Sequence, residues 1–408
     1  MKYCLIGEKL SHSYSEKLHR SFGYDYSLKE LSPCELQSFV SFGGYDGFNV
    51  TIPYKKSIIP FLDGVSDLVA RIGAVNTVKV KDGKKYGFNT DYYGFYGTVK
   101  KSGAVVNGKN VLILGSGGAC AVVKAVMEDL GAKTISVVSR SGDLNYNNVY
   151  DRTDAQIIVN ATPVGTFPDI TATPIDLTRF NQVEAVFDLI YNPYKSALIR
   201  QAKELGIKCA NGLTMLVIQA LKAREIWFDL PATDDEVKKA TSLLKNLTLN
   251  VALTGMPSCG KSTVGRALAE LTGKPFIDTD DLILSLTGRT PENIIEEDGE
   301  QVFRTVETEA VKKACSARGA IIALGGGAVL KEENRDFLKS TAFNVFIERD
   351  LALTVKDGRP LLKNADVEKV FEERAPFYNG VADCRVRNDK APEDVAKEII
   401  KNYESFGY

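Results

Sequence analysis

A glycine-framed loop in the second part of the chain has the residue types that bind nucleotide phosphates. Residues 251–263 read VALTGMPSCGKST, in which an apolar run leads to Gly255 and then to Gly260, Lys261, Ser262 and Thr263. This spacing between a strand and a helix is the P-loop pattern, in which backbone N–H groups and the helix N-terminus hold phosphate oxygens. Lys261 supplies a full charge to the outer phosphates, and the Ser262 hydroxyl can bind Mg²⁺. We therefore predict a nucleoside triphosphate site here.

Carboxylates and arginines that suit phosphoryl transfer follow this loop. Asp278 and Asp280 stand two positions apart in PFIDTDDLI, at the end of a predicted strand. A kinase needs one carboxylate near Mg²⁺ and another near the attacking hydroxyl. The further candidates are Arg304, Gly325, Gly326, Gly327, Arg359 and Arg374. Arginine forks can hold a small anionic substrate, and bare glycines allow its close approach.

A second glycine-rich turn stands earlier in the chain. The segment NVLILGSGGA runs from an apolar strand into Gly115, Gly117, Gly118 and Ala119, close to the fingerprint of a dinucleotide site. The next predicted strand, TISVVSR, ends at Arg140. An acidic residue there would bind a free ribose 2′-hydroxyl, whereas a guanidinium suits a 2′-phosphate. The pattern therefore predicts NADP.

Polar residues stand at predicted strand ends in the first part of the chain, where a core would take apolar ones. They are Ser13 and Ser15 in SHSYSEKLH, Asn49, Thr51 and Lys55 in GFNVTIPYKK, Asn76 in GAVNTV, and Asn89, Thr90 and Asp91 in GFNTDYYGF. A lysine and a carboxylate brought together there could move a proton to or from a reacting oxygen.

The elements that must position these residues alternate between strands and helices. All-apolar strands separated by helices are typical of a parallel, doubly wound α/β sheet. We expect an α/β substrate domain over residues 1–101 plus 211–228, and a Rossmann-type nucleotide domain over 102–210. Residues 229–248 hold a polar, acidic segment that we interpret as a short helical linker. The alternation restarts at 249, which predicts a P-loop α/β/α domain with a parallel sheet over 249–408.

Residues 1 to about 228 resemble shikimate dehydrogenases. The resemblance rests on Ser-x-Ser, NVTIPYK, GAVNT, NTD, GSGGA, NATPVG and GLTMLVIQA, which occur in this order. It implies that Lys55 and Asp91 flank the reacting C–O bond, where the alkoxide formed by hydride transfer needs a proton. It also implies substrate contacts from Ser13, Ser15, Thr51, Asn76, Tyr191 and Gln219, and a cofactor contact from Thr162.

Residues from about 249 to the end resemble shikimate kinases. The resemblance implies that Asp278 supports the Mg²⁺ shell and that Asp280 holds the hydroxyl that attacks the γ-phosphate. Arg304 and Arg374 would clamp the substrate carboxylate, Gly325 to Gly327 would let the ring approach, and Arg359 on a lid would neutralise transferred charge. One difference from the family is Ser258, where a glycine is common in the loop.

Composition narrows the classes of partner. The chain has 51 basic and 52 acidic residues, so no global field recruits nucleic acid or an anionic membrane. The start MKYCLIGEK is strand-like, and no apolar stretch is long enough to cross a bilayer. Seven scattered cysteines without a Cys-x-x-Cys pair favour reduced thiols. We expect a cytoplasmic protein whose partners are small molecules; the sequence does not indicate its oligomeric state.

Together these features predict a bifunctional enzyme of aromatic amino-acid biosynthesis. It would reduce 3-dehydroshikimate to shikimate with NADPH and then phosphorylate the 3-hydroxyl with ATP and Mg²⁺. Three alternatives remain open: a first half that prefers quinate or NAD, a half that is inactive and serves binding or regulation, and a nucleic-acid binder. Direct transfer of shikimate between the sites also remains open.

Overall fold

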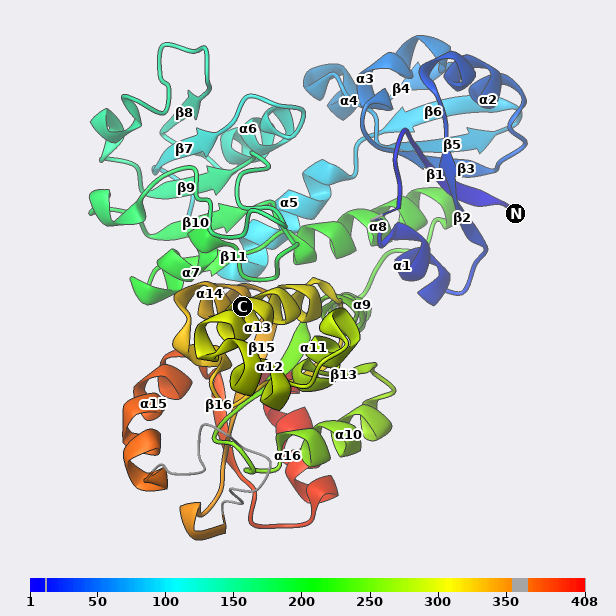
Figure 1. Cartoon of the computed structure of the whole chain (residues 1–408). Coiled ribbons are helices and arrows are strands. Elements are labelled where there is room, and N and C mark those ends of the chain that lie inside the picture. The colour runs from blue at the N-terminus through cyan, green and yellow to red at the C-terminus, as the bar shows by residue number, and fades with distance from the viewer. Residues whose placement is uncertain (12, 354–365, 408) are drawn as a thin grey trace.

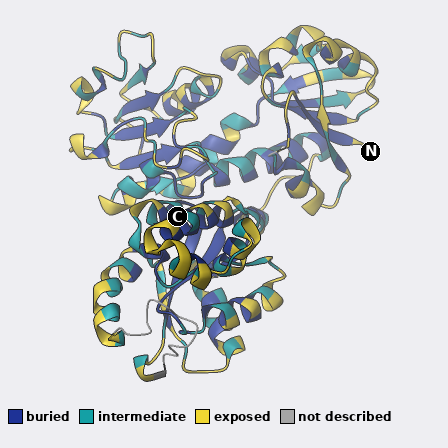
Figure 2. Cartoon of the chain, in the orientation of Figure 1, coloured by how far each residue is buried: buried dark blue, intermediate teal, exposed yellow. Residues whose placement is uncertain are grey.

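The computed structural model describes residues 1–11, 13–353 and 366–407, and within them three β-sheets follow one another along the chain (Figure 1). Residue 12, residues 354–365 and residue 408 are outside the description. The buried residues concentrate in these sheets and in the helix faces that cover them (Figure 2).

The first sheet is mixed and has the strand order β2-β1-β3-β5-β6-β4. β1 pairs parallel with β2 and β3, whereas β5 pairs antiparallel with β3 and β6. Its elements are β1 (Tyr3–Gly7), α1 (Ser15–Ser21), β2 (Tyr26–Glu30), α2 (Leu36–Phe42), β3 (Gly47–Val50), α3 (Tyr54–Ser57), β4 (Gly64–Val65), α4 (Asp67–Ile72), β5 (Thr77–Lys81) and β6 (Lys84–Phe88).

The second sheet is parallel and has the order β11-β10-β9-β7-β8. Its inner strands β7, β9 and β10 are buried because helices cover both faces, as the sequence predicts for a doubly wound sheet. The elements are α5 (Asp91–Ser102), β7 (Asn110–Leu114), α6 (Cys120–Asp129), β8 (Thr134–Val138), β9 (Ile157–Asn160), β10 (Ala185–Asp188), α7 (Ala197–Glu204), β11 (Lys208–Ala210) and α8 (Leu213–Phe228).

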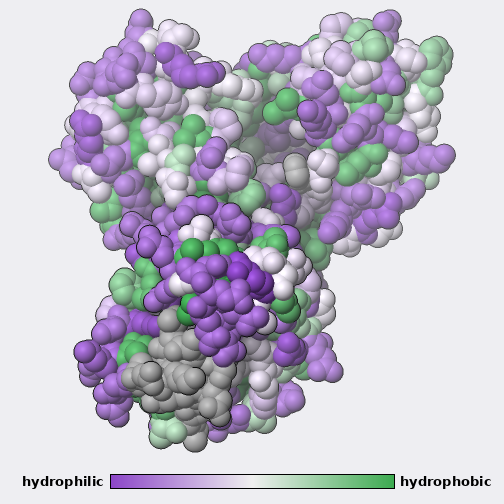
Figure 3. All heavy atoms as spheres, viewed as in Figure 1, coloured by the Kyte–Doolittle hydropathy of each residue, from purple (hydrophilic) through white to green (hydrophobic). Residues whose placement is uncertain are grey.

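Helices α5 and α8 pack against each other and join the first two sheets (Figure 1). Their backbones approach closely at two glycines. A Cβ atom on Gly94 would lie 2.6 Å from the carbonyl oxygen of Met215, and one on Gly97 would lie 2.6 Å from Cδ1 of Ile218. The missing side chains therefore allow the contact that fixes the two sheets relative to each other. Above these helices the surface is hollowed between the two sheets (Figure 3).

The third sheet is parallel and has the order β13-β14-β12-β15-β16. Its central strand β12 is buried along its whole length. The elements are β12 (Asn250–Thr254), α10 (Lys261–Thr272), β13 (Phe276–Asp278), α11 (Thr279–Thr287), α12 (Pro291–Asp298), α13 (Glu300–Ser316), β14 (Ile321–Ala323), α14 (Glu332–Thr341), β15 (Ala342–Glu348), α15 (Val367–Val381), β16 (Cys384–Arg387) and α16 (Pro392–Ser405).

The segment before the third sheet forms helix α9 (Asp234–Thr248). Thr233 and Glu236 form a capping box at its start, and Glu236 also pairs with Arg224 of α8 at 2.5 Å. Val237 and Leu244 belong to one apolar core that includes α8 and β12. The segment is therefore a packed structural element that joins the first two sheets to the third, and not a free spacer.

The third sheet docks on the rest of the chain through its amino-terminal edge. Lys195 forms an ion pair at 2.9 Å with Asp383, which precedes β16. The backbone N–H of Lys195 donates to the carbonyl of Ser340 at 3.0 Å. The two side chains of this ion pair are only 7% and 19% exposed. Arg200 of α7 pairs with Asp336 of α14 at 2.8 Å. Burial of these pairs indicates a close contact between the parts of the chain.

Candidate active sites

The polar residues of the first part meet at one edge of the first sheet. Thr51 and Lys55 follow β3, and Asp91 follows β6. Asn76 precedes β5, which runs antiparallel to both of these strands. The carboxyl ends of β3 and β6 and the amino end of β5 therefore share an edge, as the predicted site requires (Figure 1).

Lys55 and Asp91 form a direct pair. The ammonium Nζ of Lys55 donates to Oδ2 of Asp91 at 2.6 Å. Their side chains are 30% and 17% exposed, so the pair is half-buried and remains accessible to a ligand. The carbonyl of Lys55 accepts from the backbone N–H of Val75 at 2.7 Å, which fixes the short helix α3. This geometry places a proton donor beside a carboxylate that can hold it in position.

Asn76 and Gln219 connect to this pair through Thr90. The side chain of Asn76 donates to Oγ1 of Thr90 at 3.0 Å, and its Oδ1 accepts the backbone N–H of Thr90 at 2.6 Å. Oγ1 of Thr90 in turn donates to Oε1 of Gln219 at 3.3 Å. Thr90 immediately precedes Asp91, so this network fixes the start of α5 beside the lysine.

The serine turn before α1 meets Tyr191 of the second sheet through Tyr14. The backbone N–H of Ser15 donates to Oγ of Ser13 at 3.2 Å, which fixes the turn before α1. Tyr191 follows β10 of the second sheet and meets the ring of Tyr14 edge to face at 6.2 Å. The serine turn and the carboxyl edge of the second sheet are therefore neighbours.

The glycine turn after β7 has the open backbone that a dinucleotide needs. Gly115 has φ +100°, and a Cβ atom there would lie 2.7 Å from Cγ2 of Thr162. Gly117 and Gly118 are exposed, and a Cβ atom on either would meet no atom within 4 Å among the described residues. Arg140 is exposed after β8, on the same carboxyl edge. These residues fit a phosphate-bearing dinucleotide.

The loop after β12 has the expected phosphate-binding form. Gly260 has φ +96° and ends the loop at the start of α10. Nζ of Lys261 donates to the carbonyls of Gly255 at 3.0 Å and Met256 at 2.8 Å, so the Lys261 side chain reaches back across the loop. Ser258 has φ +65°, a left-handed conformation that favours glycine. The loop and the helix N-terminus fit the phosphates of ATP.

The magnesium candidates also meet. Oγ of Ser262 donates to Oδ2 of Asp278 at 2.6 Å, and Oδ1 of Asp278 accepts the backbone N–H of Asp280 at 3.0 Å. The described part of the chain contains no group of three or more His, Cys, Asp or Glu that could hold a metal. The hydroxyl and the carboxylate are both oxygen ligands, and they fit Mg²⁺, which takes few protein ligands and completes its shell with phosphate oxygens and water.

The anion clamp lies around the three glycines after β14. Nη1 of Arg304 donates to Glu307 at 2.8 Å, and Nη2 donates to Glu300 at 2.9 Å. Nη1 of Arg374 reaches the carbonyl of Gly326 at 3.4 Å. The Arg304 guanidinium lies next to Gly327, so both arginines are close to this glycine turn. Arg359 is outside the described residues.

Comparisons with known proteins match each part of the chain to a protein family. The family model described as shikimate dehydrogenase substrate binding domain matches residues 5–78, and the shikimate kinase model matches residues 257–404. The shikimate dehydrogenase (NADP(+)) of Clostridium beijerinckii is 36% identical over 265 residues, which are 60% of this chain and 98% of that protein.

Two solved structures agree with this assignment. Shikimate dehydrogenase 1 of Peptoclostridium difficile is 34% identical with a TM-score of 0.55, and it covers 60% of this chain and 97% of its own. A Thermus thermophilus shikimate dehydrogenase, solved with NADP(H) and shikimate, is 30% identical with a TM-score of 0.54. The match covers 60% of this chain and 99% of that protein. The chain belongs to the shikimate dehydrogenase family. A shikimate kinase domain follows its dehydrogenase part.

These matches confirm the predicted pair of enzyme domains and the predicted fold class. Residues 1–228 are called the dehydrogenase part below, and residues 249–408 the kinase part. No helix of the described chain is long and apolar enough to cross a membrane.

Sequence reasoning missed a network behind Thr162 in the dehydrogenase part. Asn160 Oδ1 accepts the backbone N–H and the hydroxyl of Thr162 at 3.0 and 2.7 Å, and Asn160 Nδ2 donates to Asp188 at 3.0 Å. Asp188 also accepts from the hydroxyl of Ser196 at 2.5 Å. Burial raises the pKa of Asp188 to about 6. The sequence did contain a signal for this network, because Asp188 is an acidic residue at the end of an apolar strand.

Sequence reasoning also did not identify Glu307 in the kinase part. The Glu307 side chain is 2% exposed, and burial raises the pKa of its carboxyl. A Cβ atom on Gly325 would lie 2.9 Å from Oε1 of Glu307 and 3.4 Å from Oδ1 of Asp280. The position of Glu307 three residues after Arg304 on one helix was a readable signal for an ion pair.

Proposed function

We propose that this chain reduces 3-dehydroshikimate to shikimate with NADPH and then phosphorylates shikimate at its 3-hydroxyl with ATP. The contact between Lys55 and Asp91 at 2.6 Å carries the first activity, because it supplies a held proton donor at the edge where β3 and β6 end. The Ser262–Asp278 contact behind the phosphate loop carries the second activity.

In the reduction, NADPH supplies a hydride to the ketone carbon when it is bound at the glycine turn after β7. Lys55 donates a proton from Nζ to the oxygen that becomes an alkoxide, and Asp91 holds the ammonium in place. We assign the substrate carboxylate to the hydroxyls of Ser13 and Ser15. Tyr191 and Gln219 complete the binding surface from the second sheet and from α8.

We assign the remaining polar contacts of this site to Thr51 and Asn76. Both residues stand on the edge that carries Lys55, where ring hydroxyls of the substrate would lie. Asn76 is 3% exposed and bonded to Thr90, so it acts chiefly by fixing that edge.

In the phosphorylation, Asp280 orients the attacking hydroxyl and Lys261 stabilises negative charge on the transferred phosphoryl group. Ser262 and Asp278 hold the Mg²⁺ shell. Arg304 and Arg374, which both lie next to the glycine turn, bind the shikimate carboxylate. Because Arg304 is already held by Glu300 and Glu307, its guanidinium is fixed in position before the substrate arrives.

The two activities divide along the chain as the sequence indicates. We propose a substrate domain over 1–101 plus 211–228, a cofactor domain over 102–210, a joining segment over 229–248 and a kinase domain over 249–408. The described strands fall on these divisions, since β1 to β6, β7 to β11 and β12 to β16 form separate sheets. All seven cysteines lie within the described residues and are free, which favours a cytoplasmic protein.

A coupled assay tests the proposal. The purified chain receives 3-dehydroshikimate, NADPH, ATP and Mg²⁺, and the loss of NADPH and the formation of ADP are followed together. We expect NADPH loss without ATP, and ADP formation only after reduction has begun. ADP formation from 3-dehydroshikimate in the absence of NADPH would contradict the assigned order, and no NADPH loss would refute the first activity. NADH in place of NADPH tests the NAD-using alternative.

A further inference from the structure

Arg318 of the kinase part reaches the dehydrogenase part beside the serine turn. It lies in the turn between α13 and β14, at the amino-terminal edge of the kinase sheet. Its guanidinium carbon lies 5.4 Å from the ring centroid of Tyr14, within the range of a cation–π contact. Tyr14 stands between Ser13 and Ser15, which we assign to the substrate carboxylate.

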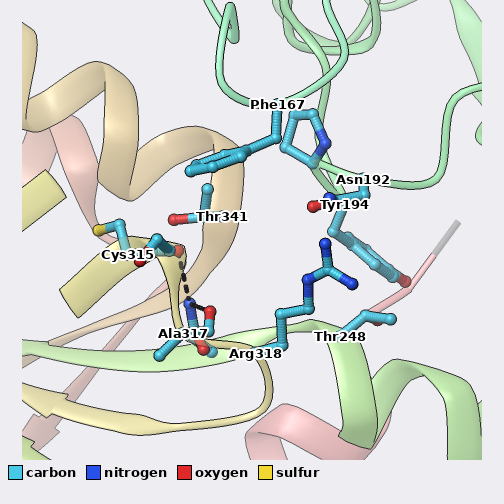
Figure 4. A pocket seen from close by; sticks show the side chains of 11 residues that line it. Phe167, Asn192, Tyr194, Thr248, Cys315, Ala317, Arg318 and Thr341 are labelled. Carbon is cyan, nitrogen blue, oxygen red and sulfur yellow. Dashed lines mark hydrogen bonds between the residues drawn. The ribbon is translucent and has the colours of Figure 1, made fainter. Parts of the chain in front are cut away.

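Arg318 is half-buried, and its charge is not neutralised by a neighbour. Among residues 1–11, 13–353 and 366–407 no carboxylate lies within 4.0 Å of its guanidinium. Figure 4 shows the side chain pointing from the kinase part into a pocket beside Tyr194, with Phe167 and Asn192 on the opposite side. That pocket leaves about 10 Å³, which is room for about one water molecule. A small metabolite does not fit there, so the guanidinium serves the surrounding protein.

The contacts of Tyr14 lead from Arg318 to the substrate-binding residues. Tyr14 is 6% exposed and belongs to the apolar core that includes α8, α9 and β12. Its ring meets that of Tyr191 edge to face at 6.2 Å. One contact with Arg318 therefore fixes both the serine turn and the tyrosine on the opposite sheet.

We propose that Arg318 is a positioning residue of the dehydrogenase site, supplied by the kinase part, which holds Tyr14 and through it the serine turn and Tyr191 in the form that binds the anionic substrate. The inference rests on the proposed function of that site. The kinase part is then more than a second catalyst on the same chain: the dehydrogenase needs it to bind substrate well.

The test uses the full chain and the variants Arg318→Ala and Arg318→Met, the latter keeping the stem without the charge. We expect KM for 3-dehydroshikimate to rise about five- to twentyfold with kcat changed much less, since the effect passes through substrate binding. KM for shikimate and ATP in the kinase reaction should not change. The matched control is Arg200→Ala, which removes another arginine ion pair between the parts without touching Tyr14.

A double-mutant cycle separates positioning from general loosening. Tyr14→Ala should raise KM like Arg318→Ala, and the double variant should be no worse than the worse single variant. Tyr14→Phe keeps the ring and should behave like the unmodified chain. Unchanged KM in both Arg318 variants, additive effects in the cycle, or an equal rise in Arg200→Ala would each overturn the inference. If the unmodified chain does not reduce 3-dehydroshikimate, it is the proposed function that fails.

Discussion

Gly327 faces the guanidinium of Arg304 so closely that any side chain at this position would force Arg304 to move. A Cβ atom on Gly327 would lie 2.3 Å from Nη1 of Arg304 and 2.7 Å from its central carbon. Arg304 is 8% exposed and is tied to Glu300 and Glu307, so it cannot move away freely. The glycine turn and the arginine clamp are therefore shaped for each other.

Gly327→Ala should disable the kinase through this clash. Because Arg304 must move, we expect kcat/KM for shikimate phosphorylation to fall about 100-fold, the cost of a displacement of about 1 Å at a site. Reduction of 3-dehydroshikimate should not change. Gly380→Ala is the matched control, since a Cβ atom there meets no atom within 4 Å among the described residues. Equal kinase rates in the two variants would contradict the assigned role of Arg304.

Lys55→Ala and Lys261→Ala should separate the two activities. Loss of the proton donor should lower kcat for reduction by about 10²–10⁴. Loss of Lys261 should lower kcat for phosphorylation by about 10²–10³, since charge stabilisation in the transition state is lost. Each variant should keep the other activity near that of the unmodified chain in steady-state assays. A loss of both activities in either variant would argue against independent sites.

Arg140→Ser should change the choice between NADPH and NADH. A hydrogen bond to a charged group contributes about 1.5–3 kcal/mol, so KM for NADPH should rise about ten- to hundredfold. KM for NADH, which lacks the 2′-phosphate, should change little. Initial rates at varied cofactor concentration measure both, and Arg152→Ser serves as a control, since this exposed arginine lies in the same part of the chain. An equal loss with both cofactors would contradict the assignment.

Asp188 should make the stability of the cofactor domain depend on pH. Its pKa is about 6 in the folded chain against an ordinary value of 3.8, so the folded state binds the proton more tightly. The contribution of Asp188 to the free energy of unfolding is fully present below pH 3.8 and is lost as the pH rises through 6. The free energy of unfolding falls by about 3 kcal/mol over this range. Asp188→Asn should remove it. Urea unfolding of both chains between about pH 4 and 7 measures the effect, and parallel curves would refute it.

The phosphate loop could be predicted from local spacing because it is a single continuous stretch. The pairing of Lys55 with Asp91 was implied by the resemblance of the surrounding motifs to shikimate dehydrogenases, and the structure brings the two side chains together. The contact between the parts gave no such signal: Lys195 and Asp383 are 188 positions apart, and only the folded chain shows that they meet. The sequence predicts a helix in the joining segment, and the repeat of Val237, Ala240 and Leu244 could also have indicated its buried face.

Shikimate released by the dehydrogenase part should be open to capture by a competitor. We expect that an excess of an unlinked shikimate kinase, with its own activity marked by a distinguishable ATP analogue, takes most of the product. The retention of most product by the fused kinase under those conditions would require a protected route.

The kinase part docks by the edge of its sheet where the strands begin, and its phosphate loop follows the end of β12. β12 has five residues and spans roughly 16 Å, so the phosphate loop lies about that far from the docked edge of the sheet. The contact between the two parts is therefore made at the end of the kinase sheet opposite the phosphate loop. In the proposed arrangement the covalent connection supplies two successive catalysts in equal amounts, and Arg318 links the kinase part to the substrate site of the dehydrogenase part.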